Sequence, residues 1–381
     1  MADTLVSSLP PVYKDLLSPE LEKPAVKETR ADCANCQMCN QGTMPAEAEA
    51  VYFRPDTKCC TYYPSLPNYL VGAILKDGSP DMQEGKRRIK EIIASRIGVY
   101  PYTVSPPGKY LTLYRAARTT SFGRSASLKC PYLTDGGLCS IWRHRESICS
   151  TFYCKYDGGE AGVAFWKTWK AYLGFVETTL AVWASKAIAR DLKNPSFQET
   201  TITLEELDDL PPKASLYESW WGSWLGREEE YYVACFNKVK HLSKKEFAKL
   251  TDETPKGKQL LSELRTRYAA LTTPFLPERL ALNGRMRRLP IANGVAITTT
   301  YNPYDSMVLE KELFDVLEKI TYDKTLADTR VELAEKEGIE LDDQLLVHLV
   351  RHAVLVGPPT DTKDEKSSDV KDEKKKKKKN R

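Results

Sequence analysis

The sequence predicts a mainly α-helical fold with small β elements, an α+β arrangement. Three observations support this fold class: long stretches with helical spacing of apolar residues, one strand-like run beside an Asn-Gly turn, and nine of ten cysteines within the first 154 of 381 residues. A chain of this length is enough for two or three domains of roughly 100–200 residues. We expect a cysteine-cluster metal-binding domain, a helical middle region and a small winged-helix-like C-terminal module.

Composition excludes several classes of protein. With 41% hydrophobic and 10% aromatic residues, the chain is not fibrous, collagen-like or wholly disordered. No window approaches the ~20 uninterrupted apolar residues of a membrane helix, and the N-terminus lacks a signal-peptide pattern, so we expect a cytoplasmic protein with no membrane contact. The net charge of +4 comes from the last 22 residues, because the rest balances at 46 basic against 46 acidic residues.

The pattern along the chain divides it into five parts. We expect an irregular lead-in (1–30), a cysteine-cluster domain that includes a long Trp-rich helix (31–200), a helical region (201–275), a winged-helix-like module (285–357) and a disordered charged tail (358–381).

Individual elements follow from periodicity and end signals. We expect helices at 66–76, 81–97, 161–192, 213–240, 244–250 and 255–271, and a short strand at 110–115. The longest helix is indicated by Trp166, Trp169 and Leu173 at helical spacing. Near the C-terminus, Asn293-Gly294 predicts a hairpin turn, followed by helices near 309–319, 325–337 and 342–352.

The first cysteine group has the spacing C-x2-C-x2-C, with Cys33, Cys36 and Cys39, and the vicinal pair Cys59-Cys60 follows. In a reducing cytoplasm such cysteines indicate metal coordination rather than disulfides. The triplet spacing is familiar from iron–sulfur ligation, whereas structural zinc more often uses separated C-x2-C pairs. The sequence therefore favours an iron–sulfur centre such as 4Fe-4S slightly over zinc.

The second cysteine group contains Cys130, Cys139, Cys149 and Cys154. Nine clustered cysteines allow two four-ligand centres with one thiol to spare, or a single centre with reactive thiols, and either Cys59 or Cys60 supplies a ligand. We expect Arg143 and Arg145 to offset thiolate charge and to engage a small cofactor. His144, between these arginines, and Cys235, in an apolar helix face, are expected to be structural.

The second group also carries a family resemblance. The run C-P-Y-L-x-x-G-G-L-C-S-I-W-x-x-R-x-x-x-C-x-x-F resembles the second half of the bacterial zinc- or iron-chelating cysteine-cluster family, whose first half is C-x2-C-x2-C-C. The matching positions are Cys130, Pro131, Leu133, Gly137, Cys139, Ile141, Arg145, Cys149 and Phe152. Glu146 and Ser150 depart from the family pattern, and 19 residues separate Cys39 from Cys59.

That family is similar to the flagellin lysine N-methylases. The similarity implies an N-methylase-like methyltransferase in which an iron–sulfur centre works with S-adenosylmethionine. Three functions therefore stay open: a cysteine-cluster metalloprotein, such an enzyme, and a zinc-stabilised interaction protein. Whether the chain is an enzyme at all is not decided by its residues.

The C-terminal module has a resemblance of its own. Residues 286–357 resemble the winged-helix peptide-recognition modules of modified-peptide biosynthesis, which implies a peptide or protein partner. Helix 325–337 carries acidic residues where a DNA-reading helix would be basic, so DNA binding through it is disfavoured. Only the Lys-rich tail, Lys374 to Lys379, suits contact with nucleic acid.

Overall fold

The computed structural model describes residues 5–17, 21, 26–39, 52–193, 202–273 and 275–359. About 51% of the chain is helical, and the sheets are small and antiparallel, which confirms the predicted mainly α fold with small β elements. The chain divides into two compact units: unit 1 is residues 1–273 with 301–305, and unit 2 is residues 274–300 with 306–381. No helix in the described ranges is long and apolar enough to cross a membrane.

Unit 1 is built from helices, and the predicted ranges 31–200 and 201–275 both fall within it. The helices are α1 (Asn68–Lys76), α2 (Gln83–Ser95), α3 (Gly108–Ser121), α4 (Ser147–Thr151), α5 (Gly159–Ile188), α6 (Leu204–Leu207), α7 (Ala214–Trp221), α8 (Glu228–Lys240), α9 (Lys244–Leu250) and α10 (Pro255–Thr272). A small antiparallel sheet has the order β1 (Leu66–Pro67), β3 (Thr103–Val104), β2 (Val99–Tyr100).

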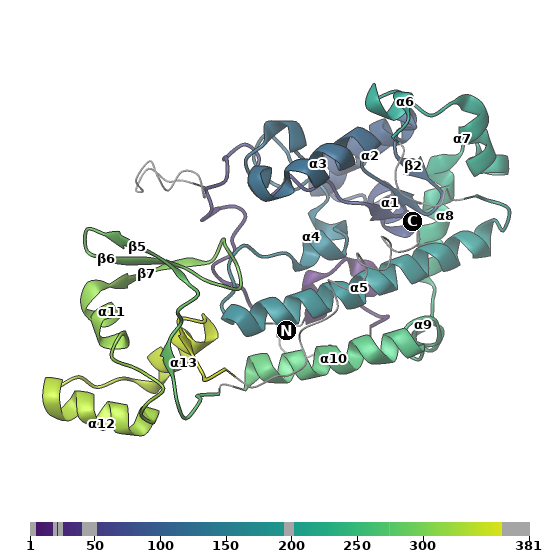
Figure 1. Cartoon of the computed structure of the whole chain (residues 1–381). Helices are drawn as coiled ribbons and strands as arrows, with labels where there is room; N and C mark the ends of the chain where they lie inside the picture. Colours follow the sequence, from purple (N-terminus) through teal and green to yellow (C-terminus); the bar gives the residue numbers. More distant parts are fainter. Residues whose placement is uncertain are drawn as a thin grey trace, which may run out of the picture. The chain divides into compact units, whose positions relative to one another are not determined.

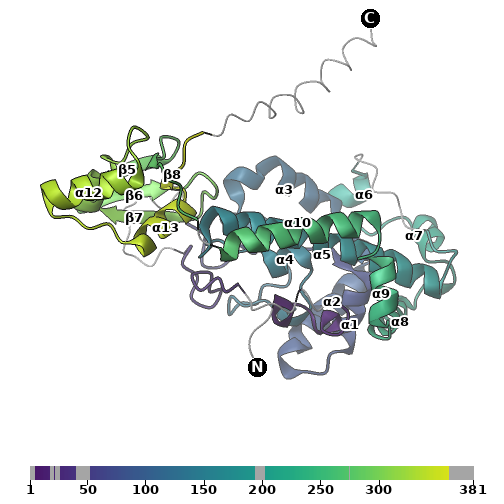
Figure 2. The same cartoon turned by 90° about the horizontal axis from the view of Figure 1, so that it is seen from below.

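Helix α5 is the central helix of unit 1. It packs against α4, α8 and α10, and Figures 1 and 2 show α10 running beside it. The predicted helical spacing brings one face of α5 into the core. The fully buried residues of this face include Trp169, Tyr172, Val176 and Leu180. The rings of Trp169 and Tyr172 stack with centroids 5.7 Å apart. Burial of this face gives the cysteine segments a rigid support.

The predicted strand at 110–115 is wrong, because these residues lie inside α3. Alternation over six residues does not separate a strand from a helix, and the chain uses the helical period instead. Tyr110 and Tyr114, four residues apart, stack at 5.9 Å, and Tyr110 packs edge-on against Tyr63 at 5.5 Å. The predicted helix 213–240 is likewise split into α7 and α8 by glycines at positive φ, Gly222 and Gly226.

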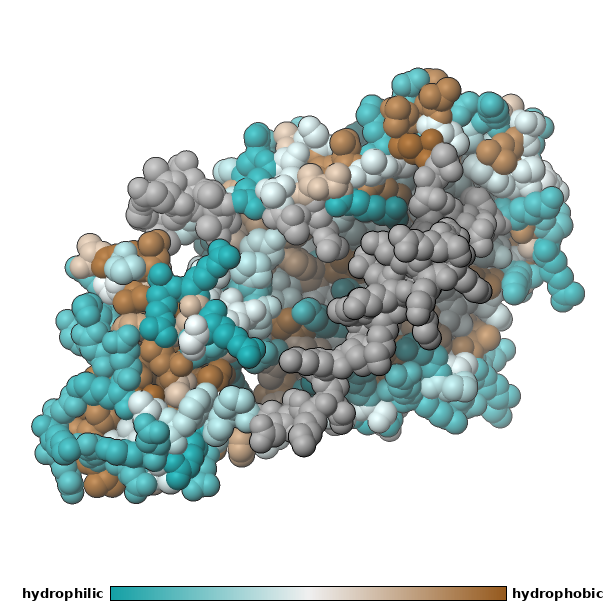
Figure 3. Space-filling model, viewed as in Figure 1, coloured by the Kyte–Doolittle hydropathy of each residue, from teal (hydrophilic) through white to brown (hydrophobic). Residues whose placement is uncertain are grey.

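A small apolar patch covers α6. Leu204, Leu207 and Leu210 are 77%, 46% and 51% exposed. Figure 3 shows brown, hydrophobic atoms gathered over the position of α6 at the upper right. The turn holds its shape through a capping box, in which Thr203 and Glu206 each accept a hydrogen bond from the backbone of the other. Local hydrogen bonding rather than burial therefore fixes this helix.

In the part of the chain that the structure describes, unit 2 combines five strands with three helices. Its elements are β4 (Ala281–Leu282), β5 (Arg287–Ile291), β6 (Gly294–Thr298), β7 (Ser306–Glu310), α11 (Lys311–Leu317), α12 (Leu326–Glu337), α13 (Asp343–Arg351) and β8 (Leu355–Val356). The main sheet has the order β5-β6-β7, and β4 pairs with β8. The strands of the main sheet thus precede three helices near the predicted positions.

The two faces of the β5-β6-β7 sheet differ. Val295, Ile297 and Leu309 are buried in the core of unit 2, whereas Leu289 and Val308 are 60% and 55% exposed. Gly294 lies so close to β7 that a Cβ would stand 2.2 Å from the carbonyl oxygen of Leu309, so only glycine fits this turn. The outer face therefore presents an apolar row across the sheet.

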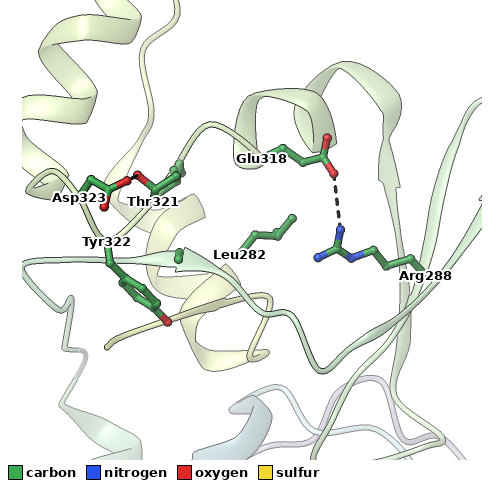
Figure 4. Close-up of a pocket in the computed structure, with 8 residues that line it drawn as sticks. Leu282, Arg288, Glu318, Thr321, Tyr322 and Asp323 are labelled. Carbon is green, nitrogen blue, oxygen red and sulfur yellow. Dashed lines mark hydrogen bonds and ion pairs between the residues drawn. The ribbon is translucent and has the colours of Figure 1, made fainter. Parts of the chain in front are cut away.

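Unit 2 also contains a shallow pocket of about 590 Å³. Figure 4 shows Arg288 reaching toward Glu318 across it, with 3.5 Å between the paired atoms. On the other side, the Thr321 hydroxyl donates to Asp323 at 3.2 Å. Arg288 and Glu318 offset each other's charge, so the Asp323 carboxylate, which accepts from Thr321, leaves the lining with one negative charge in excess.

Candidate metal centre

The nine predicted ligands come from three segments of unit 1, and hydrogen bonds join these segments. The Cys130 N–H donates to the Cys60 carbonyl at 2.8 Å. The ammonium of Lys58 donates to the carbonyl of Cys33 at 2.7 Å and to that of Gly137 at 2.9 Å. One lysine side chain therefore connects the triplet, the vicinal pair and the second group.

Local structure shapes the second group. A tight turn places Gly137 at φ +72°, and Leu133 forms a β-bridge with Cys139. Farther along, the Glu146 carboxylate accepts from the Cys149 N–H at 2.9 Å and so caps α4. The turn at Gly137 and the Glu146 cap, at a position that departs from the family pattern, thus set the backbone here.

We assign eight of the cysteines to two sets by the electrostatic interactions between their thiols, although Cys33 interacts with Cys60 and Cys139 interacts with Cys33 across these sets. The first set is Cys33, Cys36, Cys39 and Cys154, and the second is Cys60, Cys130, Cys139 and Cys149. Cys59 hydrogen-bonds to Cys60 and also interacts with Cys33 and Cys154. Each set combines three cysteines of one segment with one cysteine of another. Cys154 joins the triplet, and Cys60 joins the other three cysteines of the second group.

Burial raises the pKa of most of these thiols. It raises the pKa of Cys139 and of Cys154 to about 11, and that of Cys39 to about 12, with neighbouring cysteines adding to each rise. Burial also strongly raises the pKa of Cys130, and the neighbouring thiols of Cys60 and Cys139 add to this rise. The pKa of Cys149 is strongly raised by burial and by the neighbouring Glu146 carboxylate. Without a metal these thiols are therefore protonated at neutral pH, and a metal ion must displace their protons to bind.

Cys60 differs from the other thiols. The hydrogen bond from Cys59 lowers the pKa of Cys60, and the charges of Lys58 and Arg145 lower it further against the opposing effect of burial. The same hydrogen bond, with burial, raises the pKa of Cys59. The vicinal pair is thus asymmetric, with Cys60 closer to the thiolate state.

We expect Cys60 to be the fastest of the nine thiols to alkylate in metal-free protein, because the thiolate is the nucleophile. Lys58→Met should slow this reaction by removing the positive charge beside it. Iodoacetamide labelling at pH 7.5, followed by mass-spectrometric mapping, measures both rates. Equal rates for Cys59 and Cys60 would show that this asymmetry is absent, and an unchanged rate in Lys58→Met would show that the charge of Lys58 does not contribute to it.

The two predicted arginines lie in different surroundings. Arg145 covers the Trp142 ring at 3.3 Å, donates to the Cys149 carbonyl at 3.1 Å and lowers the pKa of Cys60. Arg143 instead lies 3.8 Å from Asp77. Arg145 is therefore the one that supplies positive charge to the cysteines.

His144 is structural, as expected. It is 5% exposed, and its Nε2 lies 2.8 Å from a carboxylate oxygen of Asp77. Burial lowers the pKa of His144, and it would raise that of Asp77, but hydrogen bonds from Ser79 and His144 bring the Asp77 pKa to about 2. Cys235 is fully buried in the core of unit 1, which matches the expected core role.

Sequence reasoning missed Lys58 as a functional residue. A lysine beside two cysteines has no distinctive pattern, and its importance comes from two long-range carbonyl contacts. Its positive φ of 48° is equally invisible in the sequence. Only a signal that reports spatial proximity would have identified it.

The described residues contain no group of three or more Cys, His, Asp or Glu side chains arranged to hold a metal ion. The cysteines share one neighbourhood but do not stand in coordination geometry. The Lys-rich tail, the other predicted binding feature, lies outside the described residues.

A second polar network lies beside Cys154. Arg30 pairs with Asp157 at 3.1 Å and with Asp305 at 3.0 Å, and Asn302 donates to the Cys154 carbonyl at 2.9 Å. These contacts hold the Tyr301–Asp305 segment within unit 1. The backbone that follows the second cysteine group is thereby fixed on one side.

Glu28 belongs to the same region and is 9% exposed. It accepts from the Trp166 indole N–H at 2.6 Å, yet burial raises its pKa to about 7. Its folded-state pKa lies above the unfolded value, so the folded protein holds this proton between pH 4.5 and 7 while the unfolded chain releases it. Stability from this group is therefore greatest below pH 4.5 and is lost as the pH rises toward 7.

We expect Glu28→Gln to remove this pH dependence. Relative to wild type, the variant should gain about 3 kcal/mol between pH 4.5 and pH 7 and hold that gain at higher pH. Urea unfolding of both proteins at several pH values measures the difference. A constant difference across this range would show that Glu28 ionises normally in the folded state.

Comparison with protein-family models, curated proteins and solved structures found no match to this chain. The family resemblance in the cysteine segments therefore stays a prediction, and the functional argument rests on the residues themselves.

Proposed function

We propose that this chain is a metalloprotein in which unit 1 binds metal through two sets of four cysteine thiolates. The first set is Cys33, Cys36, Cys39 and Cys154, and the second is Cys60, Cys130, Cys139 and Cys149. The observation that carries the proposal is the grouping of nine cysteines from three distant segments in one region. Simple burial of free cysteines gives no reason for such a grouping.

The surroundings suit a charged metal–thiolate centre. Four thiolates around a divalent ion carry a net negative charge, and Lys58 and Arg145 supply nearby positive charge. The Lys58 ammonium also ties the three cysteine segments together through backbone carbonyls. Metal binding would require the thiols to lose their protons and to move into coordination geometry.

The donor chemistry fits a thiophilic metal. All-sulfur sites select zinc or iron–sulfur clusters among common biological metals. The C-x2-C-x2-C triplet favours a 4Fe-4S cluster. A bound cluster would supply redox chemistry or an open iron position, and zinc would supply structural stability.

Metal analysis of the full chain purified without oxygen tests this proposal. Brown protein with iron and sulfide in near-equal amounts supports iron–sulfur centres, and colourless protein with two zinc ions supports zinc in the same thiolate sets. Protein that binds neither metal after anaerobic reconstitution would overturn the proposal. Circular dichroism on the same samples shows whether the fold is intact.

The methyl-transfer activity implied by the resemblance is a narrower proposal. In this version Arg145 and Arg143 hold a small cofactor beside an iron–sulfur centre. Calorimetry with S-adenosylmethionine on metal-loaded protein tests it, since absence of binding would exclude the enzyme hypothesis while leaving metal binding intact.

A peptide partner at unit 2 is the second candidate function. The apolar row of Leu289 and Val308 on the outer sheet face favours it, because extended peptides commonly dock on sheets. Selection from a displayed library of random peptides should yield binders that are lost in Leu289→Asp but retained in Leu313→Met, a conservative change in α11. Binders that tolerate Leu289→Asp would contradict this site.

A further inference from the structure

Unit 1 contains a cavity of about 250 Å³ that the metal proposal does not use. It is formed by the loop between Cys149 and Cys154, by one face of α5 and by the Tyr301–Asp305 segment, all within unit 1. Its volume corresponds to roughly eight liquid waters at ~30 Å³ each. Such a space suits a single-ring molecule rather than a nucleotide.

Aromatic side chains form the walls. Phe152, Tyr153, Trp166 and Tyr304 all line the cavity. Tyr153 and Trp166 have ring centroids 4.7 Å apart, and Phe122 packs behind Phe152 at 5.5 Å. Aromatic walls favour a planar ring that stacks or packs edge-on against them.

Hydrogen bonds hold these walls in position. The Trp166 indole is fixed by Glu28 at 2.6 Å. On the opposite wall, the Asn302 amide donates to the Cys154 carbonyl, and its oxygen accepts from the Tyr304 N–H at 3.0 Å. Because both ends of this amide are engaged, Asn302 shapes the cavity rather than recognising a ligand. The cavity is therefore preformed, which lowers the entropic cost of binding.

The charged side chains that line the cavity are all positive. Lys167 and Lys170 are its only charged members among the described residues, and both are exposed. Three residues apart on α5, they lie on the same face of the helix. Neither forms an ion pair or hydrogen bond with another described residue. The nearby carboxylates Asp157 and Asp305 are already paired with Arg30.

We propose that this cavity binds a small aromatic carboxylate, with the ring between the aromatic walls and the carboxylate at Lys167 and Lys170. The aromatic lining accounts for the ring, the volume limits the ligand to about one ring, and the two ammonium groups favour an anion. None of the nine cysteines lines the cavity, so the proposal does not rest on the metalloprotein proposal.

Isothermal titration calorimetry of the full chain with 4-hydroxyphenylacetate tests the proposal. We expect saturable binding with a dissociation constant of about 1 mM or tighter, as is usual for a ligand of this size. The neutral 4-hydroxyphenylacetamide should bind at least about tenfold more weakly, since it has the same ring without the charge.

Matched variants locate the site. Lys167→Gln combined with Lys170→Gln should weaken binding of the carboxylate about tenfold or more, because one charged contact contributes about that much. Lys186→Gln, an exposed lysine on the same helix outside the cavity, should leave it unchanged. Phe152→Ala should weaken both the carboxylate and the amide.

Three results would overturn the proposal: no saturable binding of the carboxylate, equal binding of carboxylate and amide, or unchanged binding in the double lysine variant. The lysines are exposed and their replacement spares the core, so loss of binding with an unchanged circular dichroism spectrum is assigned to the cavity.

Discussion

Gly72→Ala should destabilise unit 1 by about 3 kcal/mol, although alanine favours helix formation over glycine by about 1 kcal/mol. Gly72 lies in α1, where α8 approaches very closely. A Cβ at this position would stand 2.0 Å from the carbonyl oxygen of Tyr232 and 2.8 Å from the Cβ of Phe236. The obstacle is backbone, so the two helices must separate to accommodate one methyl group.

Urea unfolding measures the free-energy change, with Gly78→Ala as its matched control. Gly78 follows the same helix and has open space around it, so its replacement should be neutral or slightly stabilising. If Gly72→Ala were as stable as wild type, the close packing of α1 on α8 would be incorrect.

Substitutions in one thiolate set should remove the metal of that set alone. We expect Cys36→Ser and Cys154→Ser each to remove half of the bound metal, and their combination to remove no more than either. Cys36→Ser combined with Cys139→Ser should remove all of it, because the two residues belong to different sets. Metal content by mass spectrometry, measured on equal amounts of folded protein, gives the result.

Two controls sharpen this test. Cys235→Ala should leave metal content unchanged, since Cys235 is in the core and outside both sets. Cys59→Ser should also retain the metal, whereas Cys60→Ser should lose that of the second set. Complete loss of metal in Cys36→Ser alone would indicate a single shared centre.

The helices were largely predictable because their signals are local. Helix α10 begins at Pro255 as expected, with Thr254 as its N-cap, and α5 follows its apolar spacing. The strand predicted at 110–115 failed because Tyr110 and Tyr114 pack through helical neighbours that no short window of alternation reveals. Local pattern thus identified the type of most elements and misjudged one that depends on tertiary packing.

The arrangement of the cysteine region could also be predicted only in part from the sequence. The spacing of nine cysteines predicts metal ligands in separate sequence groups, whereas in the structure Cys154 of the second group interacts with Cys33 and Cys36 of the triplet. Spacing reports which ligands a short loop can bring together, whereas this pairing depends on how three distant segments meet. The role of Lys58 and the aromatic cavity depend on such contacts too, so neither was predictable.

The Tyr301–Asp305 segment has a consequence for any attempt to separate the two units. The chain passes from one unit to the other three times, because this segment belongs to unit 1 while both of its flanks belong to unit 2. A protein that ends after Thr273 would lack Asp305, the carboxylate paired with Arg30, and the Asn302 contact to Cys154. The two units thus alternate along the amino-acid sequence, and no division of the chain at a single point gives both units complete.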